Sequence, residues 1–169
     1  MSAQLKPKIT DNNVGGLVAR QEEGNRFTDT NNIPWTEFYI DGVDFKLLNY
    51  DGERVTIVTR IKKGTKLAIH QHMGPVELYV IEGSFGYKDA ETGRDNMIYA
   101  GGYLYEPPST VHEPVCPDGL LAVAVVHGPL KGFAADGSEV YIGPKEYYEM
   151  AKANNAIAHL TETRKVAGI

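Results

Sequence analysis

Residues 64–83 read GTKLAIHQHMGPVELYVIEG, and this stretch decides how the rest of the chain is interpreted. A single residue separates His70 from His72 within an apolar, strand-like segment. Because residues i and i+2 of a strand lie on the same face of a sheet, both imidazoles are expected to point the same way. Two neutral imidazoles on one side of a rigid strand form half of a metal site. Glu77, five residues further on, is a candidate to complete it.

Residues 101–116 read GGYLYEPPSTVHEPVC and supply a third histidine, His112. Gly101 lies six residues before Pro107, Ser109 follows two residues later, and His112 three residues after that. A lone histidine on a strand is usually structural or exposed, but the joint spacing of all three favours a metal site. Glu106, six residues before His112, is a second acidic candidate.

Composition excludes several classes of protein. The chain has 169 residues, a net charge of −5 and 42% hydrophobic residues, which suits one domain with one core. Without a basic cluster, neither nucleic acid nor an anionic membrane surface is an expected partner. No stretch approaches the roughly 18 apolar residues of a membrane span, and the first residues lack the apolar core of a signal peptide. Cys116 is the only cysteine, which agrees with a reducing cytoplasm.

Short alternating segments separated by turns indicate an all-β sandwich or barrel. The expected strands cover residues 43–47, 55–61, 67–72, 77–82, 84–87, 97–100, 103–106, 111–115, 120–127 and 138–142. We expect an N-terminal arm or loop at 1–35, the barrel at 36–143 and a C-terminal helix and tail at 144–169. Good helix formers follow Pro144 and predict the helix over 145–156. His159, in the polar tail, is expected to be solvated.

The two histidine-bearing stretches resemble the two sequence motifs of the cupin superfamily. The first resembles G-x5-H-x-H-x4-E-x5-6-G, and the second resembles G-x5-P-x-G-x2-H-x3-N, with Ser109 in place of glycine and Cys116 in place of asparagine. The resemblance implies a double-stranded β-helix, or jelly-roll, barrel. It also implies one divalent metal held by His70, His72 and His112, with Glu77 as the usual fourth ligand of the superfamily.

A closer resemblance is to the acetylacetone (diketone-cleaving) dioxygenases, which share H-x-H-x-G-P-x-E at residues 70–77, the glutamate at Glu106 and Gly-Pro-Leu at residues 128–130. Residues 102–107 also look like 2,4'-dihydroxyacetophenone dioxygenase, another iron cupin. In the diketone-cleaving enzymes three histidines alone hold Fe(II), and the glutamate that matches Glu77 does not bind the metal. Lys88 is the nearest equivalent of an arginine in that family's pocket.

The resemblance implies a non-haem iron dioxygenase that cleaves a C–C bond of a small β-dicarbonyl or hydroxyketone with dioxygen. Fe(II) is the metal expected in the cell, while imidazole sites also take Zn or Ni in purified protein. Glu106 is expected to orient a ligating histidine by accepting its other ring N–H. Glu77 is a ligand, a hydrogen-bonding partner of bound water or substrate, or a simple strand carboxylate. The pocket is expected to be partly aromatic, and the tyrosines on nearby strands are expected in the core more often than against a substrate. The aromatic residues on these strands are Tyr79, Phe85, Tyr87, Tyr103 and Tyr105.

Two rival functions use the same three histidines. One is a metal-dependent hydrolase or isomerase that needs no dioxygen, and the other is a non-enzymatic metal-binding or sensory cupin, like the cupin module of zinc-binding anti-sigma factors. A homodimer or higher homo-oligomer is also expected. The face of the sheet with Leu78 and Val80 is apolar, so either a second copy or a second sheet layer of the same chain covers it.

Overall fold

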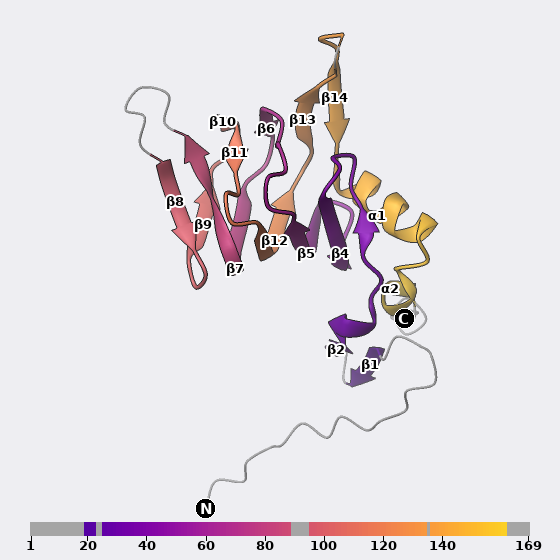
Figure 1. Ribbon diagram of the computed structural model, residues 1–169. Helices are drawn as coiled ribbons and strands as arrows, with labels where there is room; N and C mark the ends of the chain where they lie inside the picture. Colours follow the sequence, from indigo (N-terminus) through magenta and orange to yellow (C-terminus); the bar gives the residue numbers. More distant parts are fainter. Residues whose placement is uncertain (1–18, 23–24, 89–94, 135, 162–169) are drawn as a thin grey trace, which may run out of the picture.

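The computed structural model describes residues 19–22, 25–88, 95–134 and 136–161, and most of them form β-strands (Figure 1). The strands are β1 (Ala19–Glu22), β2 (Asn25–Thr28), β3 (Thr36–Glu37), β4 (Val43–Tyr50), β5 (Arg54–Ile61), β6 (His70–His72), β7 (Val76–Lys88), β8 (Asp95–Tyr99), β9 (Tyr103–Glu106), β10 (Val111–His112), β11 (Pro114–Val115), β12 (Leu120–His127), β13 (Leu130–Phe133) and β14 (Glu139–Ile142). The helices are a 3-10 turn (Thr30–Asn32), α1 (Pro144–Ala153) and α2 (Ala158–Thr161).

Two antiparallel sheets build the body of the protein. The larger sheet runs β11-β7-β12-β5-β4-β3, and β7 additionally pairs with β8 and β9. The smaller sheet runs β10-β6-β13-β14, while β1 and β2 form a separate hairpin. In Figure 1, β7, β8 and β9 stand at one end of the body and the two α-helices lie beside β4 at the other. The all-β, single-domain jelly-roll fold expected from the sequence is therefore confirmed.

The core follows the strand alternation that the sequence predicts. Along β12 the residues Leu120, Ala122, Ala124 and Val126 are buried, and the residues between them are half-buried. Leu78 and Val80 of β7 are buried in the same core. The rest of the same chain thus covers the apolar face of β7. The sequence left open whether a second copy or the same chain covers this face, and the structure shows the same chain.

A β-bulge in β7 changes which residues face the interior. Leu121 of β12 lies opposite Glu82, but Ala122 lies opposite Val80, so Ile81 is an extra residue on β7. One extra residue reverses the alternation of side chains beyond the bulge. Phe85 therefore joins the core together with Val80, although one residue number is odd and the other even. Gly83 follows the bulge with φ +80°, in the left-handed region that favours glycine.

Several elements differ from the sequence prediction. The strand expected at 67–72 is paired only at residues 70–72. The two strands expected at 77–82 and 84–87 are one continuous strand, because Gly83 between them is paired with Leu120. β13 and the β1–β2 hairpin lie in segments where polar residues and glycine gave no strand signal. Residues 1–18 of the expected arm and most of the connection at 89–96 lie outside the described residues.

The C-terminal segment packs more closely than predicted. Helix α1 ends at Ala153, and its Tyr147 ring meets Phe45 with centroids 5.1 Å apart. His159 on α2 is fully buried and donates a hydrogen bond from Nε2 to the Leu47 carbonyl at 2.8 Å. The expectation that His159 is solvated is therefore wrong, because α2 turns this residue back onto β4. Among the described residues, no helix is both long and apolar enough to cross a membrane.

A glycine-to-alanine pair tests the bulge. Gly83 and Gly101 both have positive φ, but a Cβ on Gly83 would lie 2.1 Å from the Gly119 carbonyl oxygen, whereas a Cβ on Gly101 meets nothing within 4 Å. We expect Gly101→Ala to lower the free energy of unfolding by about 1 kcal/mol through backbone strain alone. Gly83→Ala should cost at least about 2 kcal/mol more, because a backbone atom must move. Urea unfolding of both variants measures the loss of stability. Equal losses of stability would contradict the requirement for glycine where residue 83 approaches the Gly119 carbonyl.

Candidate metal centre

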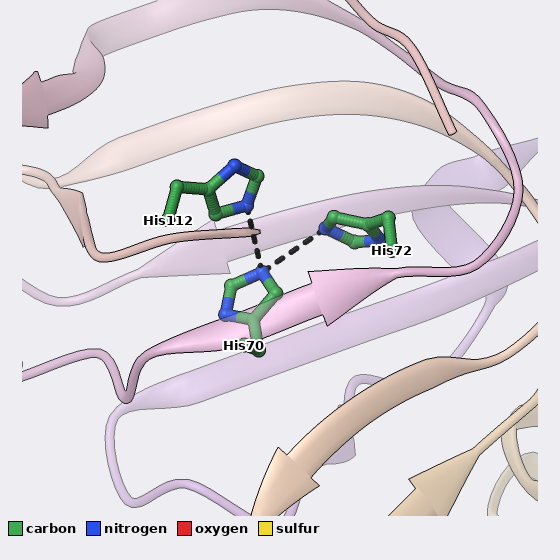
Figure 2. Close-up of side chains that lie close together, drawn as sticks. All are labelled: His70, His72 and His112. Carbon is green, nitrogen blue, oxygen red and sulfur yellow. Dashed lines mark hydrogen bonds between the residues drawn. The ribbon is translucent and has the colours of Figure 1, made fainter. Parts of the chain in front are cut away.

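Two short strands of the smaller sheet carry the three histidines. β6 pairs antiparallel with β10, and His70 lies directly opposite His112. Directly opposed residues of an antiparallel pair share a face, and so do residues two apart on one strand. His72 therefore joins the other two. Figure 2 shows the three rings converging, two from β6 and one from the other strand.

The ring nitrogens meet at short distances. Nε2 of His70 lies 3.0 Å from Nε2 of His72 and 3.1 Å from Nε2 of His112. Nδ1 of His70 donates a hydrogen bond to the Ala68 carbonyl at 2.9 Å, which fixes the proton on Nδ1 in the neutral ring and leaves a lone pair on Nε2. Nδ1 of His72 and of His112 is buried and has no hydrogen-bond partner among the described residues.

This spacing fits a metal ion. Three nitrogens that each lie about 2.1 Å from one ion, with right angles between the bonds, are about 3.0 Å apart. The two Nε2 distances at His70 have this value, and one ligand atom from each histidine lies within 4.8 Å of the others. Three ligands clustered on one side leave the opposite positions of an ion open for other molecules. The three-histidine group could therefore hold a metal with room for a substrate.

The turn before β10 holds the two strands together. The Ser109 N–H donates to the His72 carbonyl at 2.7 Å, and the Gln71 side chain donates to the Ser109 carbonyl at 3.2 Å. Ser109 has φ +70°, a left-handed conformation that costs a non-glycine residue about 1 kcal/mol or more. The structure thus explains why the motif usually has glycine here. Serine keeps the turn at the expense of some strain beside the histidines.

Burial keeps the histidines neutral. Desolvation, together with the neighbouring His70 and His112, lowers the pKa of His72 to about 3. Desolvation likewise lowers the pKa of His112 to about 4, helped by His70. The pKa of His70 is also lowered by desolvation, against the hydrogen bond to Ala68. Metal binding requires neutral imidazoles, and these shifts keep the rings in that form at neutral pH.

Glu106 lies beside the histidines, on the side of the ligand atoms. It is 4% exposed, and its Oε2 is 3.4 Å from Nε2 of His72 and 4.0 Å from Nε2 of His112. These distances are too long for hydrogen bonds, and Oε2 has no hydrogen-bond partner among the described residues. The sequence-based expectation was a contact with an outer ring nitrogen, but the carboxylate faces the inner ones. Desolvation raises the pKa of Glu106 to about 7, and a bound cation would favour its ionised form.

The structure does not bring Glu77 to the histidines. Val76 and Leu78 on either side of it are buried, so alternation turns Glu77 to the outer face of β7. There its carboxylate accepts a hydrogen bond from the Tyr103 hydroxyl at 2.8 Å. Of the roles considered from the sequence, this position corresponds to a strand carboxylate. Glu106 lies on the interior face because it is paired with Val76 across β9 and β7.

The expected aromatic pocket is divided between two faces. Tyr79, Tyr103 and Tyr105 lie on the outer face, 49%, 56% and 53% exposed, so the expectation that they lie in the core or line the pocket is wrong. Tyr87 and Phe85 face the interior because of the bulge. The Tyr87 ring stacks on His112 with centroids 4.4 Å apart and an angle of 20° between the planes. Nothing is described of the Lys88 side chain.

A cavity of about 370 Å³ adjoins Tyr87. Its walls include Phe85, Tyr87, Asn96, Met97, Ile98 and Leu104. The sequence analysis missed the last four residues. The available signal was strand alternation, because Leu104 shares a face of β9 with Glu106, two residues away.

A jelly-roll barrel with three interior histidines converging from two motif stretches defines a cupin with a site suited to a metal ion. The family comparison agrees with this class. The model of the ChrR cupin-like domain matches residues 23–131, which is more than half of the chain. The protein belongs to this cupin family. Among curated proteins no similar sequence was found.

Solved structures with the same fold include three cupins. A putative acetylacetone dioxygenase from Methylibium petroleiphilum PM1 is 22% identical, with a TM-score of 0.66 over 77% of this chain and 96% of that one. An acetylacetone dioxygenase from Acinetobacter johnsonii is 22% identical, with a TM-score of 0.59 over 90% and 94%. An RmlC-like cupin from Ralstonia eutropha JMP134 is 23% identical, with a TM-score of 0.66 over 75% and 83%. At these identities the likeness establishes the fold.

The raised pKa of Glu106 predicts a pH-dependent stability. In protein freed of metal by a chelator, the unfolded carboxyl ionises near its ordinary pKa of 4.5 and the folded one near 7. Its contribution to stability is therefore complete below pH 4.5 and is lost as the pH rises through 7. As the pH rises from 4.5 to 8, the free energy of unfolding of Glu106→Gln should increase relative to that of the unmodified protein by on the order of 2 kcal/mol. Denaturant unfolding of both proteins at several pH values measures this, and a constant difference would refute it.

Proposed function

We propose that the protein is a metal-dependent cupin dioxygenase that cleaves a C–C bond of a small β-dicarbonyl or hydroxyketone. The observation that carries the proposal is the convergence of three neutral imidazoles at Nε2 distances of 3.0 and 3.1 Å in the interior of the barrel. His70, His72 and His112 are the proposed ligands. Fe(II) is the proposed metal in the cell, with Zn or Ni as replacements in purified protein.

The charge of the ligand set favours an anionic oxygen chelate. Neutral imidazoles leave a divalent ion with its full double-positive charge, and such an ion attracts the enolate of a diketone or the anion of a hydroxyketone. When bound, Fe(II) supplies the electrons with which dioxygen is activated. The resemblance to diketone-cleaving enzymes supports this choice of substrate. In the overall reaction one C–C bond breaks, and each of its two carbons gains one oxygen atom from O2.

We propose Glu106 as the group that accepts the proton of the neutral substrate. Its Oε2 lies on the same side as the ligand nitrogens and has no hydrogen-bond partner among the described residues. A bound cation would favour the ionised carboxylate, which is the form that a general base needs. Glu77, on the outer face, has no part in this chemistry and instead supports the contact between β7 and β9.

A cytoplasmic location is part of the proposal, because one buried thiol, Cys116, suits a reducing compartment.

Three variants separate metal binding from catalysis. His112→Ala removes a proposed ligand, so iron retention and oxygen uptake should both be lost. Glu106→Gln should retain iron but lose at least about a hundredfold in oxygen uptake with a panel of diketones and hydroxyketones. His127→Ala, at a half-buried histidine away from the cluster, should change neither quantity. Metal analysis after growth with controlled iron supply and an oxygen electrode provide both measurements.

The outcomes also separate the rival functions. Unchanged iron content in His112→Ala would refute the ligand set. Tight metal binding without oxygen uptake on any compound of the panel would refute the dioxygenase and favour a hydrolase, an isomerase or a non-enzymatic metal-binding cupin.

We also propose that the protein forms a homodimer through the outer face of β9, β7 and β12. Across these strands Tyr103, Tyr79 and Val123 form one row, and Tyr105, Glu77 and Val125 form the next. The one carboxylate of these rows is already hydrogen-bonded by Tyr103, so the face brings little unpaired charge into a contact. Contiguous exposed apolar surface of this kind marks interaction sites. A flat sheet face is suited to pack against the same face of a second copy.

A charge placed on this face tests the dimer. Tyr79→Glu should convert the dimer to monomer, since two carboxylates would be buried without partners. Tyr39→Glu, at an exposed tyrosine in the loop before β4, should leave the dimer intact. Light scattering coupled to size-exclusion chromatography distinguishes the two states. A monomeric unmodified protein, or a Tyr79→Glu variant that remains dimeric, would overturn this assignment.

A further inference from the structure

The Tyr87 side chain has a feature that packing alone does not explain. Its ring lies flat on the His112 ring, with centroids 4.4 Å apart. Its hydroxyl is buried and makes no hydrogen bond with any group in the described part of the chain. A buried phenol normally finds a hydrogen-bond partner, since leaving a polar group unsatisfied is costly. A phenylalanine would fill the same space without that cost, so the hydroxyl has a function other than packing.

Tyr87 also forms one wall of the 370 Å³ cavity. Most of the other walls are apolar, formed by Phe85, Met97, Ile98 and Leu104, and exposed Asn96 lies at the edge. This volume is at the lower end of the roughly 300–1,000 Å³ found for ligand cavities. The cavity thus suits one small apolar group rather than a long chain or a sugar.

Strands β7 and β9 each carry residues beside both the cavity and the histidine centre. Tyr87 of β7 contacts His112 directly and lines the cavity. Leu104 of β9 lines the cavity as well, and Glu106, two residues along the same face, lies 3.4 Å from the His72 ligand atom. A molecule that chelates a metal at the histidines would therefore have the Tyr87 hydroxyl and the apolar walls next to it.

We propose that this cavity receives an apolar substituent, an aryl or branched alkyl group, of an oxygen-chelating substrate, and that the Tyr87 hydroxyl donates a hydrogen bond to a chelating oxygen. The inference rests on the proposed metal centre and adds the class of substrate to it. A neutral phenol is an effective donor to an anionic oxygen, because hydrogen bonds to charged acceptors are stronger than those between neutral groups. Apolar walls suit a hydrocarbon group.

The test uses two hydroxamates, which chelate metals through two oxygens whether or not the protein is a dioxygenase. Acetohydroxamate carries a methyl group and benzohydroxamate a phenyl group. Each is titrated without dioxygen into Co(II)-loaded protein, and binding is followed by the cobalt absorbance, with the metal content of every sample measured. The unmodified protein should bind benzohydroxamate roughly tenfold or more tightly than acetohydroxamate, owing to burial of the ring.

Two kinds of variant test the Tyr87 hydrogen bond and the apolar cavity separately. Tyr87→Phe keeps the ring on His112 and removes one oxygen atom, so both hydroxamates should bind about tenfold more weakly with unchanged metal content. Tyr99→Phe removes the hydroxyl of an exposed tyrosine on β8 and should change nothing. Leu104→Phe, and independently Ile98→Phe, narrow the cavity, so the preference for the phenyl group should fall while acetohydroxamate binding is kept.

Unchanged hydroxamate affinities in Tyr87→Phe would overturn the hydrogen bond. Absence of a phenyl preference in the unmodified protein, or its persistence in both narrowed variants, would overturn the substrate subsite. These failures leave metal content and oxygen uptake untouched, so they are distinct from a failure of the proposed function. A protein that retains no cobalt would overturn the metal centre and this inference together.

Discussion

The structure depends on one constraint, the approach of the His72 and His112 ring nitrogens to 3.0 and 3.1 Å from the His70 nitrogen inside a barrel. The sheet pairing of His70 opposite His112, and the strained turn at Ser109, force them together. Burial then keeps their pKa values low and the rings neutral. A divalent cation is the species that such an arrangement stabilises.

A single extra residue in β7 determines what surrounds these nitrogens. Glu77 and Tyr79, before the bulge at Ile81, face outward, while Phe85 and Tyr87, after it, face inward. Without the bulge all four odd-numbered side chains would lie on one face. The strand thereby carries an apolar surface suited to a second protein molecule on one side. On the other side it places an aromatic ring against His112.

The sequence predicted what depends on spacing and alternation. The barrel, the limits of β9 and β12 and the convergence of the histidines follow from periodicity and from the two motifs. It did not predict the interior position of Phe85 and Tyr87 relative to Glu77, because a bulge has no distinct signal apart from a glycine such as Gly83. The burial of His159 also escaped prediction, because it depends on a contact with Leu47, 112 residues earlier in the chain.

The two glutamates show that a residue's position in a sequence motif does not by itself fix its place in the structure. Glu77 occupies the motif position at which many cupins have a ligand, yet it lies on the outer face beside Tyr103. Glu106 reaches the interior from the neighbouring strand, directly across from Val76, and faces two ligand nitrogens. The sheet thus supplies a carboxylate from β9 where the motif would supply one from β7. Because a buried carboxyl oxygen without a hydrogen-bond partner is costly, the position of Glu106 Oε2 beside three neutral imidazoles supports a cation at this point.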